Sequence, residues 1–203
     1  MKNLVILLST LETILAAYLT IVRGWFVLVL LAHALFIIYA YSSVLAFKGL
    51  GELACFYFET VVVIGSYFVT SGRLSTEAFL PACIPGVFIA MVLWINEFPD
   101  VDADRASGKL TLVVRVGRRV ASRIYVSCIA LAYVLLTLVG IKDPPVLVSL
   151  VTIPLSIKSS TIVIKRYEDV EALIPAMRST ILAAILTTVI MSLAFFTSGL
   201  LGV

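Results

Sequence analysis

Long apolar runs separated by short polar breaks dominate this chain of 203 residues. Each run approaches the ~20 residues that an α-helix needs to cross a bilayer. The pattern predicts seven spans, at about residues 4–22, 24–42, 50–70, 77–97, 120–140, 144–163 and 176–199. Backbone N–H and C=O groups in lipid must be paired within their own segment, so these spans should be helices. The expected fold is all-α: a polytopic transmembrane helix bundle in which residues 1–203 form a single domain.

Composition supports an integral membrane protein of the cell membrane. The chain is 62% hydrophobic and 13% charged, whereas a soluble domain carries about 25% charged residues. The first apolar run is too long for a signal-peptide core and contains Glu12, so we expect it to be a retained span. The three cysteines lie in apolar runs without CxxC spacing, which indicates small packing residues.

The basic residues are unevenly divided between the two faces that seven spans would create. Twelve of the fifteen fall on one face, and the other carries only Arg23, Arg73 and Lys142. Because positive charge favours the cytoplasmic side, we predict that the amino terminus is inside and the carboxyl terminus outside. The polar loops at 43–49, 98–119 and 164–175 would then be cytoplasmic, and chemistry is expected there.

The stretch 95–117 contains the chemically most informative residues. Asn96, Asp100 and Asp104 recur every four positions, which places them on one stripe if the fourth helix continues past Pro99. Carboxylate oxygens in a row suit Mg²⁺, which prefers one or two carboxylates together with waters and substrate phosphates. We therefore expect Asn96, Asp100 and Asp104 to hold Mg²⁺.

Basic residues follow the acidic stripe directly. Arg105, Lys109 and Arg115 can bind diphosphate oxygens through charge and hydrogen bonds. Acidic residues that can bind a cation thus lie beside basic residues that can bind phosphate, at a membrane surface. This arrangement favours a lipid diphosphate substrate and gives no reason to expect a nucleic-acid partner. The alternative is an ordinary solvated loop of mixed charge.

The whole string Asn-x-x-x-Asp-x-x-x-Asp-Arg-x-x-Gly-Lys-x-Thr-Leu-x-Val-Arg-x-Gly resembles the second aspartate-rich motif of the UbiA superfamily of intramembrane prenyltransferases. It is most similar to the branch that prenylates 1,4-dihydroxy-2-naphthoate in the menaquinone pathway. Tyr41-Ser42, the segment 48–52 and the segment 65–69 also match that branch in order and spacing. The resemblance covers about residues 35 to 120.

This resemblance implies a Mg²⁺-dependent transfer of a prenyl group from an isoprenyl diphosphate to an aromatic acceptor. Asp100 and Asp104, assisted by Asn96, would bind the cation that polarises the leaving group. Charge on the departing diphosphate would be neutralised by Lys109, Arg115 and Lys48. Tyr41 and Tyr67 would steady the allylic cation or the acceptor. Asp100, Asp104 and Lys109 are thus the expected catalytic residues.

The chain also departs from the family pattern. Members have nine helices and two facing aspartate-rich motifs, the second after the sixth helix, whereas here the matching string follows the fourth span. The chain has two asparagines, Asn3 and Asn96, so a second Asn-x-x-x-Asp motif is impossible and the bundle is expected to be amino-terminally incomplete. Three explanations stay open: a truncated product or mis-called start that lacks an amino-terminal segment, a chain that works with a second chain, or a non-catalytic remnant or membrane subunit.

A few polar residues within the spans have no role in that motif. Glu12 and Glu59 lie in apolar surroundings and would be relay groups if the protein were a transporter. His33 is the single histidine and is expected to be a hydrogen-bonded packing residue. Glu52 is expected at the polar rim of the cavity.

Overall fold

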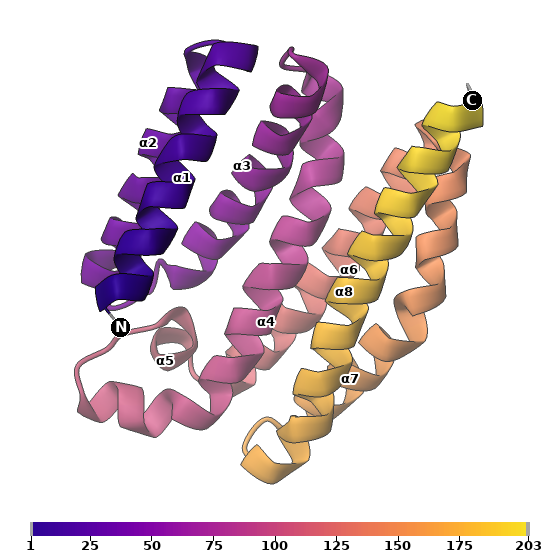
Figure 1. The fold of residues 1–203 in the computed structure, drawn as a ribbon. Coiled ribbons are helices and arrows are strands. Elements are labelled where there is room, and N and C mark those ends of the chain that lie inside the picture. Colours follow the sequence, from indigo (N-terminus) through magenta and orange to yellow (C-terminus); the bar gives the residue numbers. More distant parts are fainter. Residues whose placement is uncertain (1, 202–203) are drawn as a thin grey trace.

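The computed structural model describes residues 2–201, and within that range it contains helices and no strand. The α-helices are α1 (Lys2–Arg23), α2 (Phe26–Ala40), α3 (Gly51–Ser71), α4 (Phe79–Ala106), α5 (Leu112–Val116), α6 (Arg118–Lys142), α7 (Ile153–Arg166) and α8 (Val170–Leu201). A π-helical turn, η1 (Tyr41–Leu45), and two 3-10 segments, η2 (Thr76–Ala78) and η3 (Pro144–Thr152), join some of them. The long helices form one bundle, with the start of α1 and the end of α8 at opposite ends (Figure 1).

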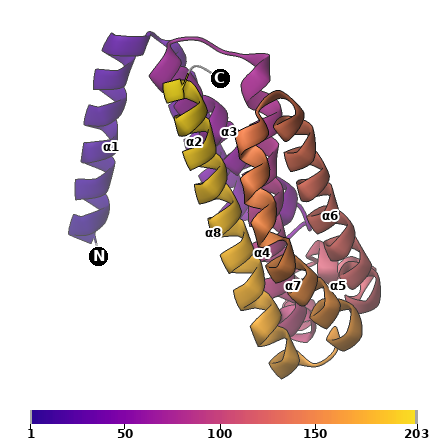
Figure 2. The same cartoon turned by 90° about the vertical axis from the view of Figure 1, so that its right-hand side faces the viewer.

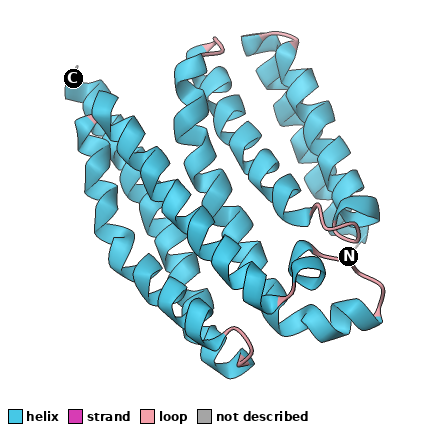
Figure 3. Cartoon of the chain, turned by 180° about the vertical axis from the view of Figure 1, so that it is seen from behind, coloured by secondary structure: helices cyan, strands magenta, loops and turns pink. Residues whose placement is uncertain are grey.

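The helices confirm the predicted all-α transmembrane fold. Six helical segments are long and apolar enough to cross a membrane, namely Ile6–Arg23, Gly51–Ser71, Thr76–Ala106, Arg118–Lys142, Pro144–Arg166 and Val170–Leu200. The predicted span at 24–42 is also helical, but its α-helical part, α2, is only 15 residues long. Gly24, with φ of 93°, ends α1, and the π-turn that begins at Tyr41 continues α2. Short loops link most neighbouring helices (Figure 3).

Helix α4 is the centre of the bundle and packs against α3, α6 and α8. It buries Phe88, Ile95 and Phe98 almost completely. The contact with α3 is close at Gly86, where an added Cβ would lie 2.6 Å from Thr60 Oγ1. Small residues allow helix backbones in membranes to approach in this way. This packing fixes the register of the two helices that carry the candidate site.

Buried hydroxyl groups join α6, α7 and α8, which lie side by side in Figure 2. Tyr125 Oη donates to Ser159 Oγ at 3.0 Å and lies 2.6 Å from Thr180 Oγ1. About two turns further along α6, Tyr133 Oη hydrogen-bonds Thr152 Oγ1 at 3.0 Å. Such bonds stabilise helix packing in lipid by roughly 0.6 kcal/mol each. They hold the three helices as a unit beside α4.

Candidate functional site

Two loops that are distant in sequence meet at the end of the bundle near the start of α3. The amide of Leu110 donates to the carbonyl of Phe47 at 3.0 Å. Arg115 spans both loops, because its guanidinium donates to the carbonyls of Leu110 at 2.9 Å and Lys48 at 3.0 Å. Gly49 has φ of 67°, and an added Cβ would lie 2.7 Å from the Leu110 carbonyl oxygen. The turn before α3 is thus fastened to the loop after α4.

The acidic stripe lies on the last turns of α4. The helix runs through Pro99 to Ala106, so Asn96, Asp100 and Asp104 share one face. After the helix ends, the loop turns back, and the amide of Lys109 donates to the Asp104 carbonyl at 2.9 Å. Lys109 Nζ also lies 2.9 Å from Asp104 Oδ2. The predicted base therefore contacts the predicted acidic stripe directly.

Several carboxylates surround Lys109. Burial lowers the pKa of its ammonium group, but the hydrogen bond and charge of Asp104, with further contributions from Glu97 and Asp100, outweigh this effect and raise the pKa above the ordinary lysine value. The Lys109 side chain is 30% exposed and that of Asp104 is 13% exposed. Lys109 therefore remains a cation beside partly shielded carboxylates, where it can donate to an incoming anion.

A buried pair of glutamates lies next to this ion pair. Glu52, in the first turn of α3, is 3% exposed, and Glu97 of α4 is 6% exposed. The two carboxyl groups lie near each other, and Glu97 also lies near Lys109 and Thr111. Three of their oxygens have no hydrogen-bond partner among the described residues. Glu52 is therefore more buried than the rim position that the sequence suggested.

Two other predicted basic residues, Arg105 and Arg115, contact backbone carbonyls. Arg105 donates to the carbonyl of Val114 at 3.4 Å, and Arg115 makes the two loop contacts described above. Arg118, which the sequence pattern did not indicate as a site residue, donates to the carbonyl of Phe98 at 3.0 Å and to Asp102 Oδ2 at 3.0 Å. These residues hold α5 and the start of α6 against α4. Lys109 is the predicted base with a direct side-chain contact to the acidic stripe.

The remaining predicted residues are divided between the cluster and more distant positions. Tyr41 is half-buried and lies close enough to Glu97, Lys109 and Glu52 to interact with them electrostatically. Lys48 lies in the turn beside Arg115 and is exposed. Tyr67 follows Glu52 by fifteen positions on α3, which is about 22 Å along the helix axis. The structure thus brings Tyr41 to the cluster and leaves Tyr67 well away from it.

The residues present fit a magnesium ion through two carboxylates. Among residues 2–201, no group of three or more His, Cys, Asp and Glu side chains is arranged to hold a metal by itself. Mg²⁺ usually takes one or two carboxylates and completes its shell with waters and substrate phosphates. Asp100 and Asp104, one turn apart on α4, match that donor set. Exposed Asn96, one turn earlier, is the further predicted ligand.

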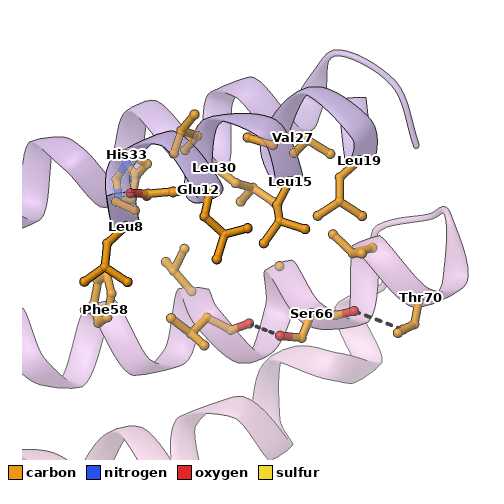
Figure 4. Close-up of a pocket in the computed structure, with 18 residues that line it drawn as sticks. Leu8, Glu12, Leu15, Leu19, Val27, Leu30, His33, Phe58, Ser66 and Thr70 are labelled. Atoms are coloured by element: carbon orange, nitrogen blue, oxygen red, sulfur yellow. Dashed lines mark hydrogen bonds between the residues drawn. The ribbon is translucent and has the colours of Figure 1, made fainter. Parts of the chain in front are cut away.

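A separate apolar pocket of about 690 Å³ lies between α1, α2 and α3. Its polar lining includes Glu12 and His33, both labelled in Figure 4. The His33 ring packs edge-on against Tyr57, with centroids 5.1 Å apart, in keeping with a packing role. Its buried Nε2 has no hydrogen-bond partner among the described residues, so the predicted hydrogen bond is not seen at that atom. None of the predicted site residues lines this pocket.

Comparison with known proteins gave one family and several relatives. The UbiA prenyltransferase family matches residues 2–179. The chain is 32% identical over 155 residues to the 1,4-dihydroxy-2-naphthoate octaprenyltransferase of Escherichia coli strain K12, covering 74% of this chain and 50% of that protein. It is 31% identical over 143 residues to the octaprenyltransferase of the same name from Mycobacterium tuberculosis, covering 70% and 49%. A 2-carboxy-1,4-naphthoquinone phytyltransferase of Synechocystis is 30% identical over 123 residues, covering 59% and 40%.

These matches are partial on the side of the relatives. The chain spans about half the length of the relatives it matches, or somewhat less. No solved structure gave a significant match to the chain.

Proposed function

The chain belongs to the UbiA prenyltransferase family, and from that premise we propose that it takes part in Mg²⁺-dependent transfer of a prenyl group from an isoprenyl diphosphate to an aromatic acceptor. The proposed setting is quinone biosynthesis of the menaquinone type, in line with the names of its relatives. One observation carries the proposal: Lys109 lies 2.9 Å from Asp104, at the end of the stripe that also bears Asp100. Cation-binding and phosphate-binding groups are thus adjacent.

In this proposal the residues of the cluster bind and orient the diphosphate. Asp100 and Asp104 would hold Mg²⁺, with Asn96 as an additional ligand. The bound ion would act as a Lewis acid on the leaving group. Lys109 donates hydrogen bonds to diphosphate oxygens and stabilises the negative charge that develops as the C–O bond breaks. Half-buried Tyr41 offers an aromatic face beside the reacting carbon.

The loop contacts around Gly49 orient Lys109. Because Arg115 contacts carbonyls of both loops, it fixes the segment 110–115 relative to the turn before α3. In this proposal Arg115 positions the phosphate-binding loop, and Lys48 extends from the same turn toward the phosphate side. Preorganised donors stabilise a developing charge without having to rearrange during the reaction.

We further propose that the stripe on α4 is one of two sides of the complete site. The relatives contain about as much sequence outside the matched region as within it. The second side would come from an additional segment, either amino-terminal to this region in a longer polypeptide or on a second chain. Partial coverage also favours a second candidate function, a non-catalytic membrane subunit that keeps the fold.

A transfer assay separates these functions. The chain is reconstituted in nanodiscs, either alone or together with membranes that contain the additional segment proposed to form the second side of the site. Each preparation is given Mg²⁺, farnesyl diphosphate and 1,4-dihydroxy-2-naphthoate. Asp100→Ala should abolish product formation. Asp102→Ala is the matched control. The Asp102 side chain is 74% exposed and pairs with Arg118, so its removal leaves the acidic stripe of α4 intact. Equal turnover by the Asp100→Ala variant would remove the site assignment, and no product under any condition would favour the subunit.

A further inference from the structure

Two exposed arginines lie in the first two turns of α6. Arg119 and Arg123 lie one turn apart, and neither forms an ion pair within the part of the chain that the structure describes. The helix begins after Gly117, which provides no side-chain cap, and its first turn has no acidic residue. Since the amino-terminal end of a helix carries partial positive charge, a cation in the first turn, here Arg119, is destabilising. A bound anion would relieve this repulsion.

These arginines lie on the face of α6 that points away from the rest of the bundle. At 100° per residue, Arg123 and Val134 fall on the same side of the helix, with Ala121 on the opposite side. Ala121 is fully buried, and its carbonyl accepts from Trp94 Nε1 of α4 at 3.1 Å. By contrast, Val134 is 54% exposed and Ile141, on the same face, is 73% exposed. Because α6 is long and apolar enough to cross a membrane, this exposed apolar face would meet lipid in a bilayer, and the arginine pair near the helix start would then lie at headgroup level.

An apolar groove of about 470 Å³ lies on the same face of α6. It is formed mainly by Ala130, Val134 and Leu138 of α6 with Leu150 of η3 and Ile153 of α7. Ala130 lies seven residues beyond Arg123, which is about 10 Å along the helix. One hydrocarbon leaflet is ~15 Å thick. A chain anchored at the arginines would therefore reach into the groove within its own leaflet.

We propose that Arg119, Arg123 and this groove bind an anionic phospholipid, with its phosphate between the guanidinium groups and one acyl chain along Ala130 and Val134. Guanidinium groups are well suited to phosphate oxygens. The charge and the adjacent apolar groove together match one amphipathic molecule. The site faces lipid and lies on the side of α6 opposite its contact with α4, so it is distinct from the cluster around Asp104. This proposal does not depend on the transferase activity.

Native mass spectrometry of the purified chain with phosphatidylglycerol or phosphatidylcholine tests the proposal. The Arg119→Gln/Arg123→Gln variant should retain phosphatidylglycerol about 25-fold less well, on the basis of roughly five-fold for each arginine near an anionic surface. Lys142→Gln is the matched control, since Lys142 is exposed at the other end of the same helix. Ala130→Trp, which fills the groove and leaves the charges in place, should also weaken retention.

Three results would overturn the proposal. The first is equal retention of phosphatidylglycerol by the double arginine variant and by Lys142→Gln. The second is equal retention of the two phospholipids by the unaltered protein, since charge would then play no part. The third is displacement of bound phosphatidylglycerol by equimolar inorganic phosphate or farnesyl diphosphate, which would assign the arginines to a soluble or substrate anion. Unchanged retention by Ala130→Trp would overturn the placement of the acyl chain.

Discussion

Substitution of Gly49 by alanine should separate the two loops of the candidate site. The added Cβ would lie 2.7 Å from the carbonyl oxygen of Leu110 and 3.0 Å from Arg115 Nε. The first neighbour is backbone, so the loop itself must move. That movement would strain or break the hydrogen bond from the Leu110 amide to the Phe47 carbonyl and the two bonds made by Arg115.

The expected loss can be worked out from these contacts. Placing a non-glycine residue at φ of +67° costs about 1–2 kcal/mol. Losing one neutral hydrogen bond and weakening the charged ones adds about 2 kcal/mol. The local opening free energy of the 107–112 loop should therefore fall by about 3–4 kcal/mol. At 1.4 kcal/mol for each factor of ten, amide exchange at Leu110 should accelerate by more than 100-fold.

Hydrogen exchange of the peptide containing Leu110, measured in nanodiscs, gives this number directly. Gly108→Ala is the matched control, because Gly108 also has positive φ, 78°, but an added Cβ meets nothing within 4 Å. The control should show the backbone strain alone, an acceleration of about 10-fold. If Gly49→Ala accelerates exchange no more than Gly108→Ala, the contact between the loops does not hold the site together.

Three further predictions concern single side chains. Lys109→Met should weaken binding of farnesyl diphosphate about ten-fold, measured by isothermal titration. Because the pKa of Lys109 is raised, its ion pair with Asp104 stays intact until the pH rises above the ordinary lysine range. Binding to the unaltered chain should therefore vary little between pH 6 and 9 on account of this group, and a loss of binding centred near pH 7 would contradict its role. Glu52→Gln should raise the stability by about 1–2 kcal/mol, since it replaces one of two adjacent buried acidic side chains, and both Glu52 oxygens lack a hydrogen-bond partner among the described residues; thermal unfolding in detergent at pH 8 measures this, and a lower midpoint would show that the Glu52 carboxyl group stabilises the fold. Tyr125→Phe should lower the stability by about 1 kcal/mol, because two buried hydroxyl contacts are lost; an unchanged unfolding midpoint would refute that network.

The helices were predictable because bilayer thickness and backbone pairing leave few alternatives. Apolar runs predicted each long helix, and Gly24 and Gly72 mark two of the breaks through positive φ. The short α2 was not predicted, since the widening into a π-turn at Tyr41 leaves no trace in hydropathy. The predicted sidedness of the loops and termini stays a prediction.

The candidate site was predictable only where its residues are close in sequence. Asn96, Asp100 and Asp104 share a stripe by helical periodicity, and Lys109 returns to Asp104 within five residues. The approach of Glu52 to Glu97 depends on how α3 packs against α4, which local spacing does not encode. The available signal was Glu52, an acidic residue at the start of an apolar helix. Such a residue indicates a functional position, but its spacing does not identify Glu97 as its neighbour.

The hydrogen-bond partners of two arginines also differ from those that the sequence suggested. Arg105 and Arg115 have the composition and position of phosphate ligands, yet their hydrogen bonds go to carbonyls of Val114, Leu110 and Lys48. Loop carbonyls without helical partners need donors, and that demand becomes visible only once the loops are placed. Sequence alone therefore predicted the charges but not which of them serve the backbone.

Equilibrium binding of a labelled isoprenyl diphosphate to the purified chain, with and without Mg²⁺, tests the central claim most directly. Mg²⁺ should strengthen binding to the unaltered chain and to Asp102→Ala. In the Asp100→Ala variant, the enhancement of binding by Mg²⁺ should be smaller than in the unaltered chain. The reduction should exceed the ~10–100-fold loss that is typical when an outer-shell partner of a metal is removed. Binding that is equally strong with and without Mg²⁺ in all three proteins would contradict the claim that the α4 stripe holds a cation for the diphosphate.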